Sequence, residues 1–170
     1  MKLKRGVAVL AVATSLLAMA GIAAAAGAFE GAKPATAGFH DVDKAIEAGY
    51  SFRLPELSGK TCITQPGEGA MGVHMVNVGL LDGVIDADEP EVLVYEPRND
   101  GTLKLVAVEY VIFQGPGVER PSLFGRQFDV VGDPNRYGLP AFYALHAWIW
   151  KPNPSGILHA WNPNVECDGS

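Results

Sequence analysis

Two histidines and one glutamate lie in runs whose patterns predict β-strands, and they form the strongest candidate site in the sequence. The residues are His74, Glu109 and His146. Period-two alternation places Glu109 on a strand face with apolar neighbours. These neighbours are Leu105, Ala107, Val111 and Phe113. A carboxylate in such a stripe is costly unless it is paired, protonated or bound to a cation, so we expect Glu109 to meet a histidine.

Two imidazoles and one carboxylate support three kinds of role. They can hold a divalent transition metal such as Zn or Fe, with positions left for water or substrate. Without a metal, a Glu–His pair can act as a general base and its orienting partner. A buried, hydrogen-bonded Glu–His pair can also simply tie strands together. The spacing contains no HxH or HExxH element, so all three interpretations stay open.

Aromatic residues surround this set in the sequence. Trp148 and Trp150 share the predicted strand face of His146, and Tyr95 lies on another predicted strand. A small-ligand pocket needs aromatic walls with a few polar groups, although an ordinary core uses the same residues. We therefore expect Trp148, Trp150 and Tyr95 to line a ligand pocket, and most other aromatic side chains to belong to the core.

Sequence motifs of common enzyme classes are missing. The chain has no GxSxG motif, no P-loop and no Rossmann glycine pattern. The acidic segment 80–90 lacks the order of a calcium-binding loop and is expected to be a solvated turn. His40 and His159 are expected near the surface. The sequence thus assigns no catalytic residue and does not decide whether the protein is an enzyme.

An N-terminal helix and an antiparallel sheet are expected to position the candidate residues. Apolar residues at helical spacing predict one amphipathic helix over 36–49, capped by Thr36 and ended by Gly49. The predicted strands are 73–76, 91–96, 103–113 and 142–150. Turn residues at 97–101 predict a hairpin between the middle two strands.

The connections between these strands are too short for crossover helices, so the sheet is expected to be antiparallel. The fold class is therefore α+β: a curved antiparallel sheet, one N-terminal amphipathic helix and a long covering loop over 115–140. Within that loop, the segment 121–129 has an alternative interpretation as a turn or short edge strand.

The first 28 residues are typical of a secretory signal peptide. Lys2, Lys4 and Arg5 precede an apolar run over 6–26, and Ala24 with Ala26, or Ala26 with Ala28, fits an A-x-A cleavage pattern. An uncleaved membrane anchor is the alternative, because the run is long enough to span a bilayer. After cleavage, the protein is expected to be extracytoplasmic and free of the membrane.

The remaining chain suits a flexible linker over 29–35 and a single domain over 36–170. Without residues 1–28 it carries 10 basic and 19 acidic residues, a net charge of −9. Such an acidic domain repels phosphate backbones, so we expect it not to bind nucleic acid. Cys62 and Cys167 most simply pair in an exported chain, since CxxC spacing is absent; free thiols or metal ligation are the alternatives.

Five strings taken together resemble a family of secreted bacterial proteins without an assigned activity. They are FHDVDKAIEAGY, GAMGVHMVN, PEVLVYEP, LVAVEYVIF and LHAWIWKPNPSGILHAWNPNVEC. They follow one another over nearly all of the mature chain, and the MGxH, VEY and LHxWxW blocks contain His74, Glu109 and His146. The resemblance implies export, a single domain and the C-terminal cysteine, and it implies no catalytic role.

The sequence therefore predicts an exported domain that binds a small ligand or a metal ion through His74, Glu109 and His146. The first alternative is a metal-dependent hydrolase or oxygenase that uses the same three residues. The second is a purely structural or interaction domain with an acidic surface.

Overall fold

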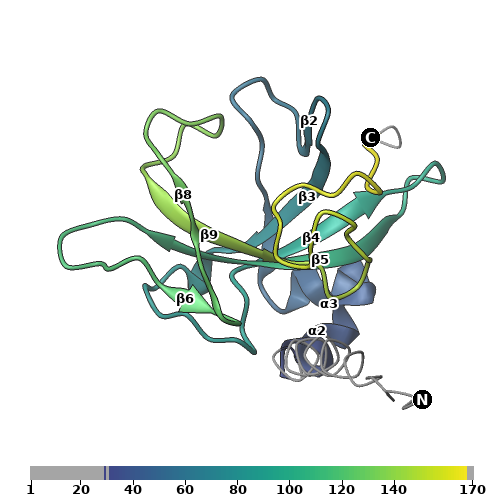
Figure 1. Ribbon diagram of the computed structural model, residues 1–170. Helices are drawn as coiled ribbons and strands as arrows, with labels where there is room; N and C mark the ends of the chain where they lie inside the picture. Colours follow the sequence, from purple (N-terminus) through teal and green to yellow (C-terminus); the bar gives the residue numbers. More distant parts are fainter. Residues whose placement is uncertain (1–28, 30, 168–170) are drawn as a thin grey trace, which may run out of the picture.

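The computed structural model describes residue 29 and residues 31–167. The predicted signal peptide at 1–28 lies outside the described residues. None of the helices in the described part of the chain is long and apolar enough to cross a membrane. Figure 1 shows one large sheet, with the short N-terminal helices gathered on one side of it.

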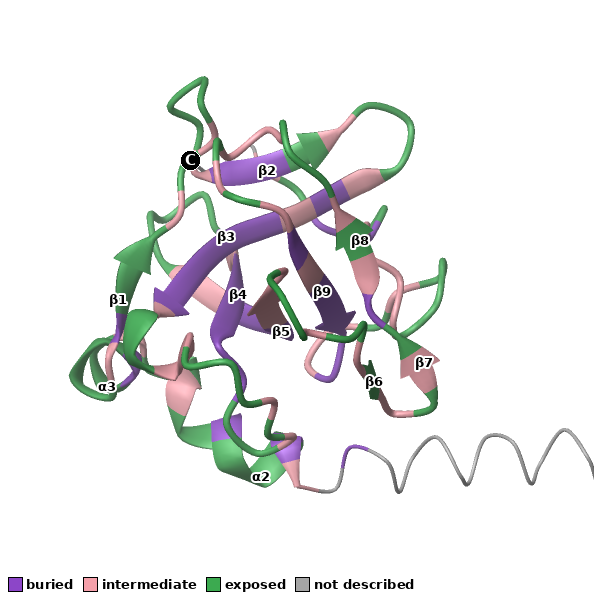
Figure 2. Ribbon diagram, turned by 90° about the vertical axis from the view of Figure 1, so that its left-hand side faces the viewer, coloured by how far each residue is buried: buried purple, intermediate pink, exposed green. Residues whose placement is uncertain are grey.

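Within the described residues, seven antiparallel strands form the main sheet, and six of them follow the order β1-β3-β4-β5-β9-β8. The central strands are β3 (Gly69–Asn77), β4 (Val92–Pro97), β5 (Leu103–Phe113) and β9 (Phe142–Ala147). The outer strands are β1 (Tyr50–Arg53), β2 (Cys62–Gln65) and β8 (Asp129–Val131). Buried positions concentrate on the central strands (Figure 2). The architecture is mostly antiparallel sheet with few helices, in agreement with the predicted α+β class.

The predicted hairpin between β4 and β5 is confirmed, and its register contains a bulge. Val94 pairs with Ala107 and the next residue, Tyr95, pairs with Leu105, so Val106 is the extra residue. Because of this extra residue, the β5 residues on the N-terminal side of the bulge face the side of the sheet opposite to the one that regular alternation predicts. Leu105 therefore lies in the core on the helix side of the sheet, and the expectation that it shares a face with Glu109 is wrong.

The strand predicted over 142–150 ends at Ala147. Ala147 pairs with Val108, which lies two positions from the bulge residue Val106 of β5. Beyond it the amide of Trp148 donates to the carbonyl of Ile157, and the amide of Trp150 returns to β5 and donates to the carbonyl of Val106. The regular ladder is thus interrupted beside the β5 bulge, earlier than the aromatic run predicts.

A second bulge shapes β3, where Ile63 pairs with Gly72 and Thr64 pairs with Ala70. Met71 is the extra residue, and Gly72 has a φ of +108°. A Cβ atom at position 72 would lie 2.5 Å from the carbonyl oxygen of Tyr95, so only glycine fits there.

The predicted continuous helix over 36–49 is broken at Asp41. A 3-10 helix, η1 (Ala37–His40), precedes Asp41 and α3 (Val42–Glu47) follows it. Asp41 has extended dihedral angles and its side chain accepts from the amide of Asp43, so it begins a new helix. Gly49 follows α3 with a φ of +101°, the left-handed conformation expected after a helix end.

Thr36 ends a short helix rather than capping the predicted one. It closes α2 (Ala32–Thr36), and its buried hydroxyl donates to the carbonyl of Ala32. α2 overlaps the segment 29–35 that the sequence predicts as a linker. The buried side chain of Phe29 belongs to the core cluster on the helix side, which ties this segment to the domain.

The long covering segment contains three short strands. β6 (Ser122–Leu123) and β7 (Arg126–Gln127) form a hairpin, and β8 adds to the edge of β9. Phe124 and Gly125 make the tight turn with φ values of 54° and 77°, as two-residue hairpins require. The edge-strand interpretation of 121–129 therefore describes this region better than an unstructured loop.

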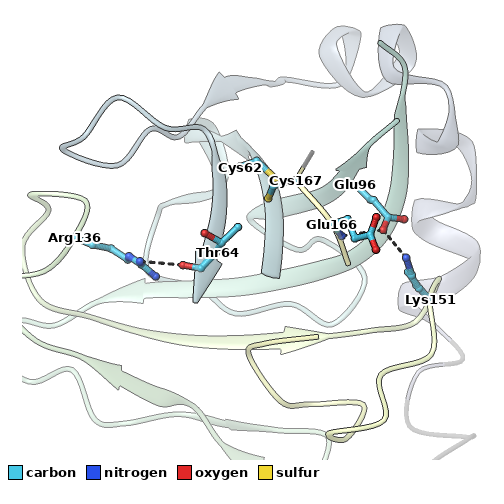
Figure 3. The surroundings of a disulfide bond; sticks show 7 residues. All are labelled: Cys62, Thr64, Glu96, Arg136, Lys151, Glu166 and Cys167. Carbon is cyan, nitrogen blue, oxygen red and sulfur yellow. Dashed lines mark hydrogen bonds and ion pairs between the residues drawn. A yellow bond between two sulfur atoms is a disulfide. The ribbon is translucent and has the colours of Figure 1, made fainter. Parts of the chain in front are cut away.

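The predicted disulfide between Cys62 and Cys167 is present. Figure 3 shows Cys62 on β2 facing Cys167 of the C-terminal segment, near the ion pair of Lys151 with Glu96. The bond joins positions 105 residues apart, so it encloses nearly all of the sheet.

Opening this bond should destabilise the domain strongly. A disulfide that closes a loop of this length lowers the conformational entropy of the unfolded chain. Loss of the disulfide therefore costs about 4 kcal/mol of stability in the chain-entropy model. We expect a Cys62→Ala/Cys167→Ala variant to lose about that much free energy of unfolding in urea. Reduced wild-type protein serves as the matched control and should show the same loss. Equal stability of oxidised and reduced protein would contradict this assignment.

Candidate metal centre

Three strands of the main sheet carry His74, Glu109 and His146 to the same cavity. Glu109 of β5 and His146 of β9 are direct register partners, which places their side chains beside each other. His74 stands on β3, and β4 separates β3 from β5. Two strand spacings amount to about 10 Å, so the side chains of His74 and Glu109 reach toward each other across β4.

The three side chains converge closely. Nε2 of His74 lies 3.3 Å from Nε2 of His146 and 3.5 Å from Oε2 of Glu109. Oε1 of Glu109 lies 3.4 Å from Nδ1 of His146. One ligand atom from each residue lies within 4.8 Å of the others, so the three residues could hold a metal ion. We call them the His–Glu–His cluster.

Burial controls the charge of the cluster, since the exposed fractions of His74, Glu109 and His146 are 1%, 7% and 3%. Burial raises the pKa of Glu109 to about 8, and the carboxylates of Glu91 and Asp129 add to the shift. Burial lowers the pKa of His74 to about 4 and that of His146 well below its usual value. At neutral pH the cluster without a metal therefore holds a protonated carboxyl and two neutral imidazoles.

The neutral cluster leaves one polar atom unsatisfied. Nδ1 of His74 is buried without a well-aligned hydrogen-bond partner in the described structure, although the Gly72 backbone acts on the ring and opposes the lowering of its pKa. A neutral imidazole has one N–H group, so Nδ1 is either a donor without an acceptor or an acceptor without a donor. An unsatisfied buried polar group costs about 1–3 kcal/mol, and such a cost often marks a functional site.

The cluster forms the polar end of an apolar cavity of about 160 Å³. Its walls come from the sheet face opposite the helices and from loops at both edges of the sheet. Apolar lining residues include Leu54, Val92, Val111, Phe113, Leu139 and Phe142. The arrangement places two imidazoles and a carboxyl group at the end of a hydrophobic space, which is the usual composition of a small-ligand site.

The aromatic residues predicted to line a ligand pocket lie outside this cavity. Trp148 stacks on His146 with ring centroids 6.2 Å apart, and its indole donates to the carbonyl of His159. Trp150 lies beyond the end of β9 and packs on the helix side, where Tyr95 is fully buried in the core. Trp148 therefore packs against the His146 ring, while Trp150 and Tyr95 belong to the core on the helix side of the sheet.

Tyr137 and Met71 line the cavity and are absent from the sequence-based set. Tyr137 belongs to the loop between β8 and β9, and burial raises the pKa of its hydroxyl, with Glu109 contributing. Met71 reaches the cavity because of the β3 bulge. An aromatic residue between prolines and glycines in a long loop is the only signal for Tyr137 that the sequence offers.

Comparisons with known proteins give no independent assignment. No family model matches the chain, and no significant similarity to a curated protein or to a solved structure was found. The resemblance to a secreted bacterial family therefore stays a prediction. The role of the cluster has to be inferred from its own geometry and chemistry.

The raised pKa of Glu109 predicts a pH-dependent stability. A folded-state pKa of about 8 exceeds that of a carboxyl in the unfolded chain, so protein without metal loses stability as the pH rises toward 8. The lowered pKa of His74 has the opposite effect, because it makes the folded protein more stable as the pH rises. This gain in stability is complete above about pH 6.5. We therefore measure the free energy of unfolding of Glu109→Gln and of the wild type in the presence of a chelator. The variant's value minus the wild-type value should rise by up to about 1.4 kcal/mol per pH unit between pH 6.5 and 8.

Urea unfolding at a series of pH values measures this difference directly. Glu91, whose pKa is raised to about 7 by burial, titrates in both proteins, so its contribution largely cancels in the comparison. A stability difference that stays constant from pH 6.5 to 8 would show that the Glu109 carboxyl of the folded protein is already ionised at pH 6.5, as it is in the unfolded chain.

Proposed function

We propose that this domain binds a divalent transition-metal ion through His74, Glu109 and His146. The observation that carries the proposal is the convergence of three buried ligand atoms at the end of an apolar cavity. Two imidazoles and one carboxylate are a donor set that suits Zn(II) and Fe(II). The cluster needs no further protein ligand, because such sites commonly leave a position for water or another molecule.

The distances in the cluster support this donor set. Ligand atoms at tetrahedral positions about 2.0–2.1 Å from a metal ion lie about 3.4 Å from one another. Nε2 of His74 is 3.3 Å from Nε2 of His146 and 3.5 Å from Oε2 of Glu109. Two edges of the ligand triangle thus have the required length.

Charge balance supports the same proposal. Among the described residues, the imidazoles of His74 and His146 are the basic groups within 4.0 Å of the Glu109 carboxyl, so the protein brings no permanent positive charge into contact with it. A divalent ion replaces the carboxyl proton and supplies that charge. The alternative of a purely structural cluster requires the buried carboxyl to keep its proton permanently.

The expected affinity is moderate. A metal-binding histidine usually donates its second N–H group to an acceptor, and the loss of such a partner lowers affinity about 10–100-fold. Nδ1 of His74 has no well-aligned hydrogen-bond partner in the described structure. We therefore expect a dissociation constant weaker than that of a fully supported structural zinc site.

A metal titration of tag-free protein tests this proposal. We expect one equivalent of Zn(II) or Fe(II) to bind the wild type at pH 8, measured by calorimetry and by elemental analysis after desalting. His74→Ala and Glu109→Gln each remove a ligand and should weaken binding at least about 100-fold. His40→Ala is the matched control, since His40 is exposed and outside the cluster.

Two outcomes would contradict the proposal. The first is less than a tenth of an equivalent of bound metal in the wild type after incubation with either ion. The second is equal binding in the cluster variants and the wild type, which would place the ion elsewhere. A purely structural cluster instead predicts a lower melting temperature in both cluster variants with no metal binding to lose.

We also propose that the protein acts outside the cytoplasm. The Cys62–Cys167 disulfide is compatible with an oxidising compartment, and the N-terminal pattern is typical of a secretory signal. Expression of the whole chain in a bacterial host should release a protein that begins after residue 26 or 28, measured by intact mass. A full-length chain in the membrane fraction would instead support the anchor alternative.

A further inference from the structure

The walls of the cavity restrict what can bind above the His–Glu–His cluster. Among the described lining residues outside the cluster, the polar side chains are Tyr137 and Asp129. Asp129 already pairs with Arg126 through both carboxylate oxygens, at 2.8 and 3.2 Å. Phe52 and Val78 also line the cavity and are 49% and 60% exposed, so the entrance is apolar as well. The space therefore favours a ligand with an apolar body.

The volume of the cavity limits the size of that body. The cavity measures about 160 Å³. An apolar protein cavity of about 150 Å³ is large enough to hold benzene. The body that fits is therefore about one six-membered ring, or a six-carbon chain.

The charge of a loaded cluster determines the other end of the ligand. A divalent ion with two neutral imidazoles and one carboxylate leaves a net charge of +1 at the end of an apolar space. Asp129 is neutralised by Arg126, so no unpaired acidic side chain among the described lining residues compensates this charge. An uncompensated buried charge is costly, and a single anionic oxygen donor on the ligand would remove it.

Tyr137 offers a hydrogen bond for a second ligand oxygen. Its hydroxyl donates to Sδ of Met71 at 3.7 Å. A thioether is a weak acceptor, and an ionised carboxylate is a much stronger one. Exchange of the Met71 contact for a carboxylate oxygen would therefore be favourable. Tyr137 and Glu109 line the same cavity, and the charge of Glu109 acts on the Tyr137 hydroxyl, so this donor and the cluster share one binding space.

We propose that the cavity binds a small apolar monocarboxylate, with one carboxylate oxygen on the metal ion and the other accepting from the Tyr137 hydroxyl. The apolar body lies against Val111, Phe113 and Phe142. This inference rests on the proposed metal site and names the class of its ligand. It assigns to Tyr137 the positioning of the ligand head group.

Calorimetric titration of zinc-loaded protein with benzoate tests the inference. The zinc content of each sample is measured first, so that a failure of the metal site is recognised separately. We expect saturable binding of one benzoate per protein. Acetate lacks the apolar body and toluene lacks the carboxylate, so each should bind at least about tenfold more weakly. Protein without metal should also bind benzoate at least about tenfold more weakly.

Tyr137→Phe removes only the proposed hydrogen-bond donor. It should weaken benzoate binding about tenfold and leave zinc binding unchanged, because a hydrogen bond to a charged group contributes about 1.5–3 kcal/mol. Tyr143→Phe is the matched control, since Tyr143 packs on the opposite face of β9. Its benzoate affinity should equal that of the wild type.

Several results would overturn the inference while the metal site stands. Zinc-loaded protein that fails to bind benzoate would do so, as would equal affinities for benzoate and acetate. Equal benzoate affinity with and without zinc would exclude coordination of the carboxylate. An unchanged affinity in Tyr137→Phe would remove the role of the hydroxyl. Failure of the protein to take up zinc would overturn both this inference and the proposed function.

Discussion

The carboxyl group of Glu109 is buried between two imidazoles, and no lysine or arginine among the described residues forms an ion pair with it. A buried carboxylate requires a proton or a cation, because water no longer solvates its charge. This single constraint allows the cluster a protonated neutral state and, under the proposed function, a metal-bound state. The apolar residues of the cavity wall add to this constraint, since they bring no positive charge to the Glu109 carboxylate.

Irregularities in the strands allow the sheet to satisfy this constraint. The bulge at Met71 and Gly72 brings both Met71 and His74 to the cavity side of β3. The bulge at Val106 shifts the face of β5 so that Leu105 packs toward the helices while Glu109 faces the cavity. Regular alternation would have placed these residues differently.

Sequence patterns predicted the residues of the cluster better than they predicted its walls. A glutamate and two histidines inside apolar strands are visible because burial of such side chains needs an explanation. The hairpin between β4 and β5 follows from turn chemistry in the same way. Bulges carry no clear periodic signal, so the placement of Leu105 and the early end of β9 could not be predicted. Tyr137 reaches the cavity through a loop whose path depends on tertiary contacts alone.

X-ray absorption spectroscopy of the zinc-loaded protein tests the central claim most directly, because it reports the atoms that surround the ion. Coordination by the His–Glu–His cluster predicts a first shell of nitrogen and oxygen donors at about 2.0–2.1 Å with the outer-shell scattering of two imidazoles. The Glu109→Gln variant should lose one oxygen donor from that shell. A shell of oxygen atoms without imidazole scattering, or one that contains sulfur, would contradict the account.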